Sequence, residues 1–309
     1  MRLISFSLVL IVFPIIVFGQ TSWRGSVSTN WNTSTNWTHG VPSSTTDAFI
    51  GDSNFTGSYA PRLSSQSNCR SLSVGGAVAA AFTVGDRNLT VWGNVLINSN
   101  GSISHGKGLF SVKGNWTNNG SYATTKNQAT VYFAGSGIQN VGGSSTTPFK
   151  RLTVGASSHL TCSHTFSAGG GGSSIIVNGI FDPGSIQVTG SASLTVNSGG
   201  VLIVTTPTFS GNFGTTGSKI LNAGSLVNYG ASATQTLDQT LSYSNLTCSG
   251  SGTKNAGGIL TIRKDLTITS GVTFSAGNYT HTISGNINNA GTLNPGGSTV
   301  VLNEQAVRR

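Results

Sequence analysis

The chain contains two copies of one pattern, and this repetition limits the possible folds more than any other feature. Residues 89–122 (LTVWGNVLINSNGSISHGKGLFSVKGNWTNNGSY) align without a gap with residues 260–293 (LTIRKDLTITSGVTFSAGNYTHTISGNINNAGTL). The copies share apolar positions two residues apart and Gly or Asn at the turns, whereas the intervening positions differ, as at Trp92 and Arg263. Such self-similarity is typical of a solenoid, in which each unit stacks on the one before it.

Short runs of alternating Val, Ile, Leu and Thr separated by Gly, Asn and Ser indicate many short strands joined by tight bends. We therefore predict an all-β fold, a parallel β-helix-like solenoid over residues 62–303, with roughly 20–25 residues per rung and on the order of ten to twelve rungs. In this register Val112, Trp116 and Tyr122 point into the core. The alternative is an array of β-sandwiches, which explains the short strands but not repeated corners without hairpin signals.

The composition excludes some classes of protein. Charged residues make up 7% of the chain, with 16 Lys and Arg against 7 Asp and Glu, but the apolar residues are too regularly spaced for a disordered chain. The basic residues are scattered along the sequence rather than collected in a stripe with interleaved aromatics, so we expect no nucleic-acid partner. Weak attraction to acidic polysaccharide or lipopolysaccharide is compatible with the net charge of +9.

Residues 1–19 have the pattern of a signal peptide. Arg2 precedes the apolar run LISFSLVLIVFPIIVF, and Val17 and Gly19 stand at the small-residue positions before a cleavage site, so Gln20 is the expected mature N-terminus. A retained membrane anchor is the alternative, although the run is short of the roughly 20 residues that a span needs. Since no later stretch suits a transmembrane segment, we expect a secreted protein, extracellular or at the outer cell surface.

The two ends of the mature chain differ from the repeats. Residues 20–61 hold three of the five tryptophans, Trp23, Trp31 and Trp37, and we interpret this segment as a cap over the open end of the solenoid. An aromatic sugar-binding platform is the alternative. After Asn303 the repeat pattern stops, and we interpret residues 304–309 as the aberrant or truncated C-terminus of a fragment.

Three cysteines are an odd number for an exported chain. Cys162 follows Leu160, and Cys248 follows Leu246, at the spacing that places both members of each pair on one face of a strand. Buried free thiols are therefore our first interpretation. A Cys162–Cys248 disulfide requires that their rungs adjoin, and the pairing state of Cys69 stays open.

The N-terminal segment and the repeats together resemble repeat-rich secreted surface proteins of Bacteroidota-type bacteria. The first motif is carried by Trp23, Gly25, Trp31, Asn36, Trp37, Gly40, Pro42 and Asp47. The second, of the form G-N-W-x-N-N-G-x-F followed by V-x-F-x-G, is carried by residues 114–122, Val131, Phe133 and Gly135, and again by residues 285–293. The resemblance implies an adhesin- or autotransporter-passenger-like β-solenoid. Many such proteins carry a C-terminal sorting domain for type IX secretion, whose pattern is absent from these 309 residues.

No cluster of residues predicts catalysis. Glycoside hydrolysis usually needs two facing carboxylates, but the acidic residues form no D-D, D-x-D or N-x-D cluster: Asp47, Asp52, Asp86, Asp182, Asp238, Asp265 and Glu304. The segment TIRKD places Arg263, Lys264 and Asp265 on one edge, where a polysaccharide lyase would need a base beside an acidic calcium cluster. We do not favour this site and expect no enzymatic activity.

The segment HLTCSHTF contains His159, Cys162 and His164, a combination that suggests zinc, but strand alternation places His159 on the face opposite Cys162. An ice-binding face is not favoured either, because paired threonines such as Thr267 and Thr269 do not recur in register on every rung. We predict no catalytic, cofactor-binding or metal-binding residues and no cofactor.

The sequence thus favours an exported, non-enzymatic, structural or adhesive β-solenoid that is displayed at or released from a bacterial surface. Its expected partners are glycans or cell-surface and matrix components. The alternative is a carbohydrate-active or carbohydrate-binding β-helix domain, lyase- or glycosidase-like, of a longer protein.

Overall fold

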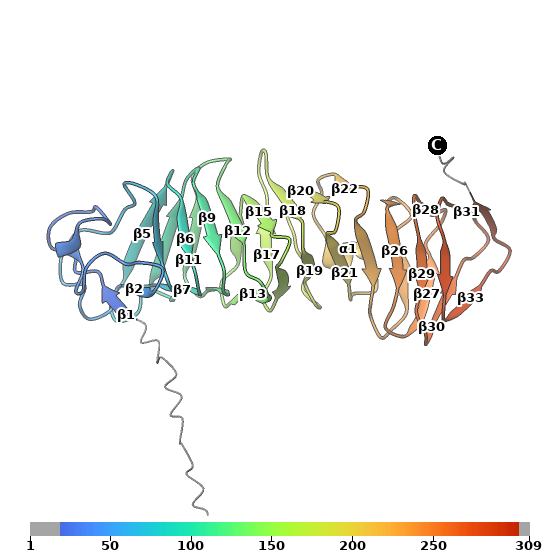
Figure 1. The fold of residues 1–309 in the computed structure, drawn as a ribbon, viewed down its shortest axis with the longest axis horizontal. Helices are drawn as coiled ribbons and strands as arrows, with labels where there is room; N and C mark the ends of the chain where they lie inside the picture. Colours follow the sequence, from blue (N-terminus) through green and yellow to red (C-terminus); the bar gives the residue numbers. More distant parts are fainter. Residues whose placement is uncertain (1–18, 303–309) are drawn as a thin grey trace, which may run out of the picture.

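The computed structural model describes residues 19–302, which form one elongated rod of stacked coils (Figure 1). Thirteen strands, one from each coil, lie side by side in a single parallel sheet along the rod. Every pairing between the named strands is parallel, which confirms the predicted solenoid and excludes an array of sandwiches built from antiparallel hairpins. The predicted signal peptide, apart from Gly19, and the predicted aberrant C-terminus lie outside the described residues.

The long sheet follows the order of the chain. Its strands are β1 (Gly19–Ser22), β2 (Thr46–Ile50), β4 (Leu72–Val74), β7 (Val95–Ile97), β10 (Trp116–Asn118), β13 (Ile138–Gly143), β16 (His159–Cys162), β19 (Ile180–Asp182), β21 (Val201–Val204), β23 (Leu226–Tyr229), β26 (Asn245–Cys248), β29 (Leu266–Ile268) and β32 (Ile287–Asn289). Beyond residue 62, residues paired between neighbouring strands of this sheet are separated along the sequence by 19 to 25 residues. The extremes are Leu226 with Asn245 and Trp116 with Val141. The predicted rung length is therefore confirmed.

Two further faces complete each coil, and both are interrupted. The second face has three sheets: β5 (Ala80–Gly85), β8 (Gly101–His105) and β11 (Ser121–Thr124); β14 (Thr147–Phe149) and β17 (Phe166–Ala168); β24 (Gln235–Leu237), β27 (Gly252–Ala256), β30 (Val272–Ser275) and β33 (Thr292–Asn294). The third has two: β3 (Ser67–Cys69), β6 (Leu89–Val91), β9 (Leu109–Val112), β12 (Thr130–Phe133), β15 (Arg151–Val154), β18 (Ser174–Val177), β20 (Ser193–Val196) and β22 (Lys219–Leu221); β25 (Ser242–Tyr243), β28 (Thr261–Ile262), β31 (Thr280–Ile283) and β34 (Thr299–Leu302).

The two short helices are η1 (Ser34–Asn36) and α1 (Phe209–Asn212). Helix α1 lies between β21 and β22 and interrupts the second face, whereas the third face is interrupted after it, between β22 and β25. At the helix, the Asn212 side chain accepts from the backbone N–H groups of Thr205 and Thr206 and donates to the carbonyl of Gly184. One amide thus replaces several of the backbone bonds that a strand would have made. Within the described residues, no helix is long and apolar enough to cross a membrane.

The two aligned copies of the repeat occupy equivalent coils. Strands β7 to β11 of the first copy correspond in position to β29 to β33 of the second. At the same corner, the N–H of Asn115 donates to the side chain of Asn94, and the N–H of Asn286 donates to the side chain of Asp265, both at 2.8 Å. Gly120, which both copies have as glycine, is needed for space, because a Cβ there would lie 2.2 Å from the carbonyl oxygen of Asn98. The shared residues are therefore those that let one coil sit directly on another.

Apolar side chains fill the centre of the rod. Val112 and Trp116 are fully buried and Tyr122 is 3% exposed, as predicted, and the Trp116 ring packs edge-on against Tyr122 and Phe149 at centroid distances of 5.0 and 5.5 Å. In the second copy Leu293 is 36% exposed, because it belongs to the last described coil and packs against one neighbour only.

The tryptophans of the N-terminal segment close the first coil. Trp23, Trp31 and Trp37 are almost fully buried, and the Trp31 ring lies 5.0 Å from that of Phe82 in β5. Gly25 has φ of +62°, and a Cβ there would approach the Trp23 Nε1 to 2.9 Å, which explains the W-x-G spacing. The segment is a cap, and its buried rings are not available as a sugar platform. The long sheet already begins inside it, at β1 and β2.

Replacing Trp116 by Ala should lower the free energy of unfolding by about 3–5 kcal/mol, because a fully buried ring leaves a cavity. The matched control is Trp92→Ala, which removes a ring that is 48% exposed and should cost less than about 1 kcal/mol. Denaturant unfolding of the two variants measures the difference. Equal losses in both would contradict the register of the core.

Candidate functional site

Each acidic side chain that the structure describes accepts hydrogen bonds from the scaffold. Asp47 accepts two bonds from the Arg70 guanidinium and a third from the N–H of Ser71 at 3.0 Å. Asp86 and Asp265 each accept from a backbone N–H on the next coil, that of Lys107 and that of Asn286, both at 2.8 Å. The other described carboxylates each accept from the N–H two residues later in their own turn: Asp52, Asp182 and Asp238. Glu304 lies outside the described residues.

The residues of TIRKD have separate partners. Arg263 donates to the carbonyls of Leu221 and Tyr243, so it spans the interruption between β22 and β25 on the third face. Asp265 takes the corner position that Asn94 holds in the first copy, and Lys264 is exposed. The structure thus gives Arg263 and Asp265 roles in joining coils.

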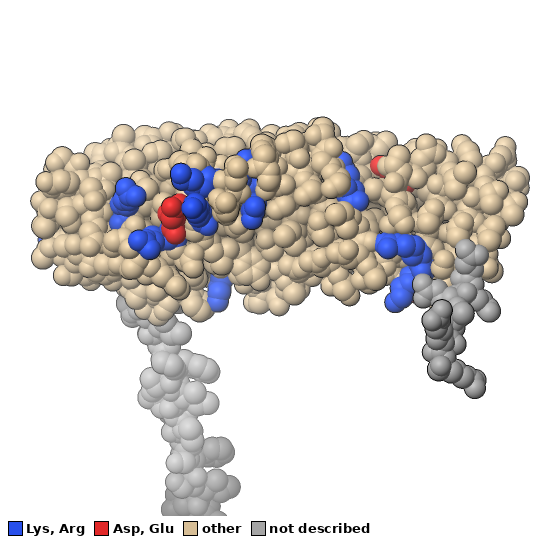
Figure 2. Space-filling view, turned by 90° about the horizontal axis from the view of Figure 1, so that it is seen from above, with Lys and Arg blue, Asp and Glu red and all other residues tan. Residues whose placement is uncertain are grey.

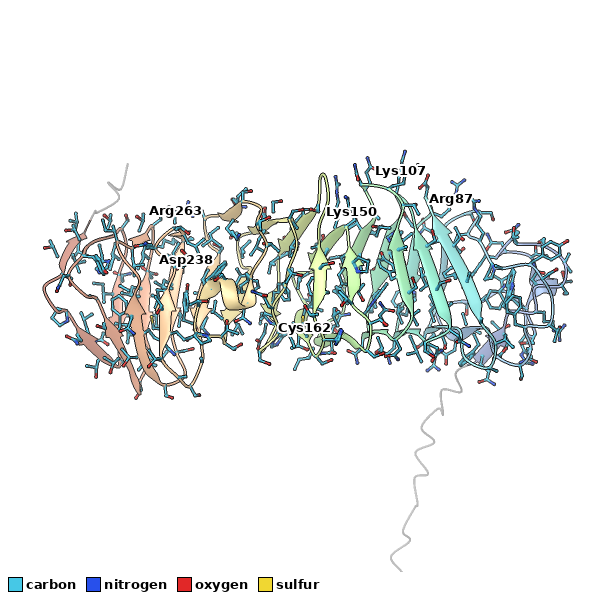
Figure 3. The ribbon with its side chains drawn as sticks, turned by 180° about the vertical axis from the view of Figure 1, so that it is seen from behind. Arg87, Lys107, Lys150, Cys162, Asp238 and Arg263 are labelled. Carbon is cyan, nitrogen blue, oxygen red and sulfur yellow. The ribbon has the colours of Figure 1, made fainter. Side chains whose placement is uncertain are left out.

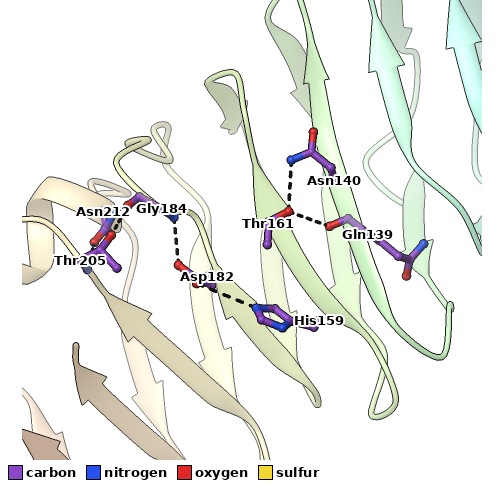
Figure 4. Close-up of polar contacts among 8 residues, drawn as sticks. All are labelled: Gln139, Asn140, His159, Thr161, Asp182, Gly184, Thr205 and Asn212. Carbon is purple, nitrogen blue, oxygen red and sulfur yellow. Dashed lines mark hydrogen bonds and ion pairs between the residues drawn. The ribbon is translucent and has the colours of Figure 1, made fainter. Parts of the chain in front are cut away.

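The histidines and cysteine of HLTCSHTF do not converge. His159 Nε2 lies 3.9 Å from an Asp182 carboxylate oxygen on the adjacent strand (Figure 4). Next to this pair, Thr161 accepts from the Asn140 amide at 3.1 Å and donates to the Gln139 carbonyl. Among residues 19–302, no three His, Cys, Asp or Glu side chains are placed to hold a metal ion.

All three cysteines are free. Cys69 and Cys248 are buried and Cys162 is half-buried, because it ends its strand at a corner of the coil. Strands β16 and β26 are separated in the sheet by β19, β21 and β23, which places Cys162 and Cys248 about 19 Å apart at the usual strand spacing. A disulfide needs Cα atoms within about 7 Å, so these rungs do not allow one.

One buried histidine belongs to the core. The two ring nitrogens of His105 lie 2.7 Å from the Tyr122 hydroxyl and 2.7 Å from the Gly108 carbonyl. Burial lowers the pKa of His105 to about 4, although the Gly108 carbonyl and the charge of Asp86 oppose the shift. The imidazole is therefore neutral near pH 7 and acts as a hydrogen-bonded core residue.

An exposed aromatic ring borders a shallow hollow on the third face. Trp92 follows β6 and lines a hollow of about 250 Å³ together with Gln66, Asn68 and Thr90. Lys113 Nζ lies 3.4 Å from the centre of the Trp92 ring and covers one of its faces. The sequence predicted that Trp92 points outward, and this is confirmed, but it did not predict the hollow.

A larger groove of about 670 Å³ lies over the outer face of β5 and β8 and over the turn that follows β11. Its floor carries the small side chains of Thr83 and Ser104, which are paired on neighbouring strands. Arg62 bridges to Thr83 at the N-terminal end, and Arg87 and Lys126 line the groove at the corner leading to the third face. All three basic side chains are exposed.

The basic residues continue along this corner. Figure 3 shows Arg87, Lys107 and Lys150 on one edge of the rod, and Figure 2 looks onto that edge, where Lys and Arg gather over the N-terminal half. In the sequence these residues looked scattered, since Arg87 and Lys107 are 20 residues apart and Lys126 follows 19 later. Counting basic residues at the rung period would have revealed the row.

Comparison with known proteins identifies no relative, since no family model, no curated protein and no solved structure matches the chain.

Lowering the pH from 6.5 to 4 should destabilise the protein by about 3 kcal/mol through His105 alone. The folded state holds the imidazole neutral and the unfolded state protonates near pH 6.5, so this stabilisation is complete above that pH and is lost as the pH falls toward 4. Unfolding titrations of the wild type and His105→Gln should show a pH slope that is smaller in the variant. His39→Gln, which removes an exposed imidazole, is the control, and an unchanged slope in His105→Gln would contradict the assignment.

The thiols should be unreactive in the native protein. Burial raises the pKa of Cys162 and of Cys248 to about 12 and raises that of Cys69 further, so little thiolate is present near pH 8. We expect a thiol reagent to titrate three groups in denaturant and fewer than one within minutes in buffer. A titre of one in denaturant under non-reducing conditions would reveal a disulfide.

Proposed function

We propose that the protein is an exported, non-enzymatic rod that is displayed at or released from a bacterial surface and adheres to glycans or matrix components. The observation that carries this proposal is which positions of the repeat its two copies share. The positions that stack inward or turn a corner are shared, and the outward positions are free to differ. Such a scaffold supports a variable outer surface without altering its core.

The polar chemistry of the chain supports a binding role. The described carboxylates hold corners or neighbouring side chains, and the His105 ring is buried between a hydroxyl and a carbonyl. By contrast, Trp92, Arg87 and Lys107 are exposed on the faces of the rod. Exposed aromatic and basic side chains on a rigid scaffold suit recognition of an extended surface.

A carbohydrate-binding role for the hollow at Trp92 is the second candidate. One face of an indole ring beside the amides of Gln66 and Asn68 provides the stacking surface and hydrogen-bonding groups that a sugar ring needs. Trp92→Ala should then abolish binding to neutral glycans while leaving the fold unchanged.

The test is to present the full chain to arrays of glycans, bacterial cells and matrix proteins, and in parallel to assay a panel of polysaccharides for released products. We expect saturable binding without new reducing ends or unsaturated products. Absence of binding on every array would refute the adhesive role. Release of products from any polysaccharide would instead favour the carbohydrate-active alternative.

A further inference from the structure

We infer that the groove over β5, β8 and the turn that follows β11 binds a polyanionic glycan, a polysaccharide chain that carries carboxylate or sulfate groups along its length. The inference rests on the proposed adhesive function and names the class of partner for one surface of the rod. It follows from the spacing of the charges, from their lack of internal partners and from the chemistry of the groove lining.

The charges form a row with one member on each coil. Arg87 follows β5, Lys107 follows β8 and Lys126 follows β11, so all three occupy the same corner on consecutive coils. The register is fixed by backbone bonds, since the N–H of Gly106 donates to the carbonyl of Gly85 and that of Thr125 to the carbonyl of His105, both at 2.8 Å. Neighbouring strands are about 4.8 Å apart. This is less than the Debye length of about 8 Å at physiological salt, so the fields of successive charges add.

The basic side chains of the row and groove form no ion pair within the described residues, and they outnumber the acidic ones. Neither of the two ion pairs within residues 19–302 involves Arg62, Arg87, Lys107 or Lys126. Asp86 is the one acidic residue that lines the groove, against the three basic residues Arg62, Arg87 and Lys126, so the lining keeps an excess of positive charge. Like charges held at this spacing repel one another, and a linear chain of anions relieves that repulsion.

The lining favours a sugar polymer over a nucleic acid. Hydroxyl and amide side chains account for half of the residues that line the groove: Thr29, Asn30, Ser64, Thr83, Ser104 and Thr125. These groups suit the hydroxyls of a saccharide, and the guanidinium groups of Arg62 and Arg87 match carboxylate or sulfate oxygens in a two-pronged geometry. No aromatic side chain lines the groove, so the stacking platforms that single-stranded nucleic acids use are missing from it.

The experiment measures binding of the full chain to immobilised polygalacturonate, dextran sulfate, neutral dextran and single-stranded DNA. The test variant is Arg87→Gln/Lys126→Gln, which removes two basic side chains that line the groove. The matched control is Arg24→Gln/Lys264→Gln, which removes one Arg and one Lys that are exposed and do not line the groove. We expect binding to at least one of the two anionic polysaccharides, weakened about tenfold by the test variant and less than twofold by the control. Raising the salt concentration from 50 to 200 mM should weaken it about tenfold or more.

The arms separate the possible failures. The carboxylate and sulfate arms show which anionic group is recognised. Equal weakening by both double variants would mean that net charge alone is responsible, and tighter binding to DNA than to both polysaccharides would reassign the groove to nucleic acid. If the wild type binds cells or neutral glycans but binds no polyanion, this inference fails while the adhesive function stands. If nothing binds on any surface, both fail.

Discussion

Backbone hydrogen bonds between successive coils hold the rod together, and the rest of the structure adapts to them. Strands that pair in parallel and in register must carry inward side chains of compatible size on every coil, as Phe82, Ile103 and Tyr122 do on the second face. At the corners the chain must turn without pushing its neighbours apart, which restricts Gly120 to glycine. Side-chain amides and carboxylates extend the ladder where the strands stop. The sequence repeats because these contacts restrict the same inward and corner positions on every coil.

The same constraint explains how few acidic groups are available for chemistry. A corner position accepts Asn94 in one copy and Asp265 in the other, because both side chains bind the same backbone N–H of the next coil. Cations cannot replace them, since they lack an acceptor. The cations that do join coils donate to carbonyls instead. The buried ammonium group of Lys254 donates to three, including those of Ala231 and Ala233, and the Arg263 guanidinium donates to that of Leu221. Most other cations lie on the outside, where they set the character of the surface.

Much of the fold could be predicted from the sequence because inward positions and turn residues follow local rules. Alternation placed Val112 and Trp116 in the core, and the repeat length set the number of coils. The groove could not be predicted in the same way. Arg87, Lys107 and Lys126 come together only because three coils of about 20 residues stack in register, and one insertion within a coil would separate them. Burial at strand ends was also hard to predict, as Cys162 shows.

The interruption around α1 gives the rod an uneven bending stiffness. Only the long sheet is continuous from the first coil to the last. Across α1 the second face keeps isolated backbone bridges, Val188 to Phe213 and Thr208 to Thr236, beside the Asn212 side chain. The Arg263 side chain spans the break in the third face. A rod with one continuous sheet and two interrupted faces bends most easily where the two faces are interrupted. We therefore expect sideways load on the rod to concentrate between β21 and β25, the stretch that contains both breaks. Bending there would change the angle between the N-terminal half, which carries the basic row, and the C-terminal half while each keeps its own stack of coils.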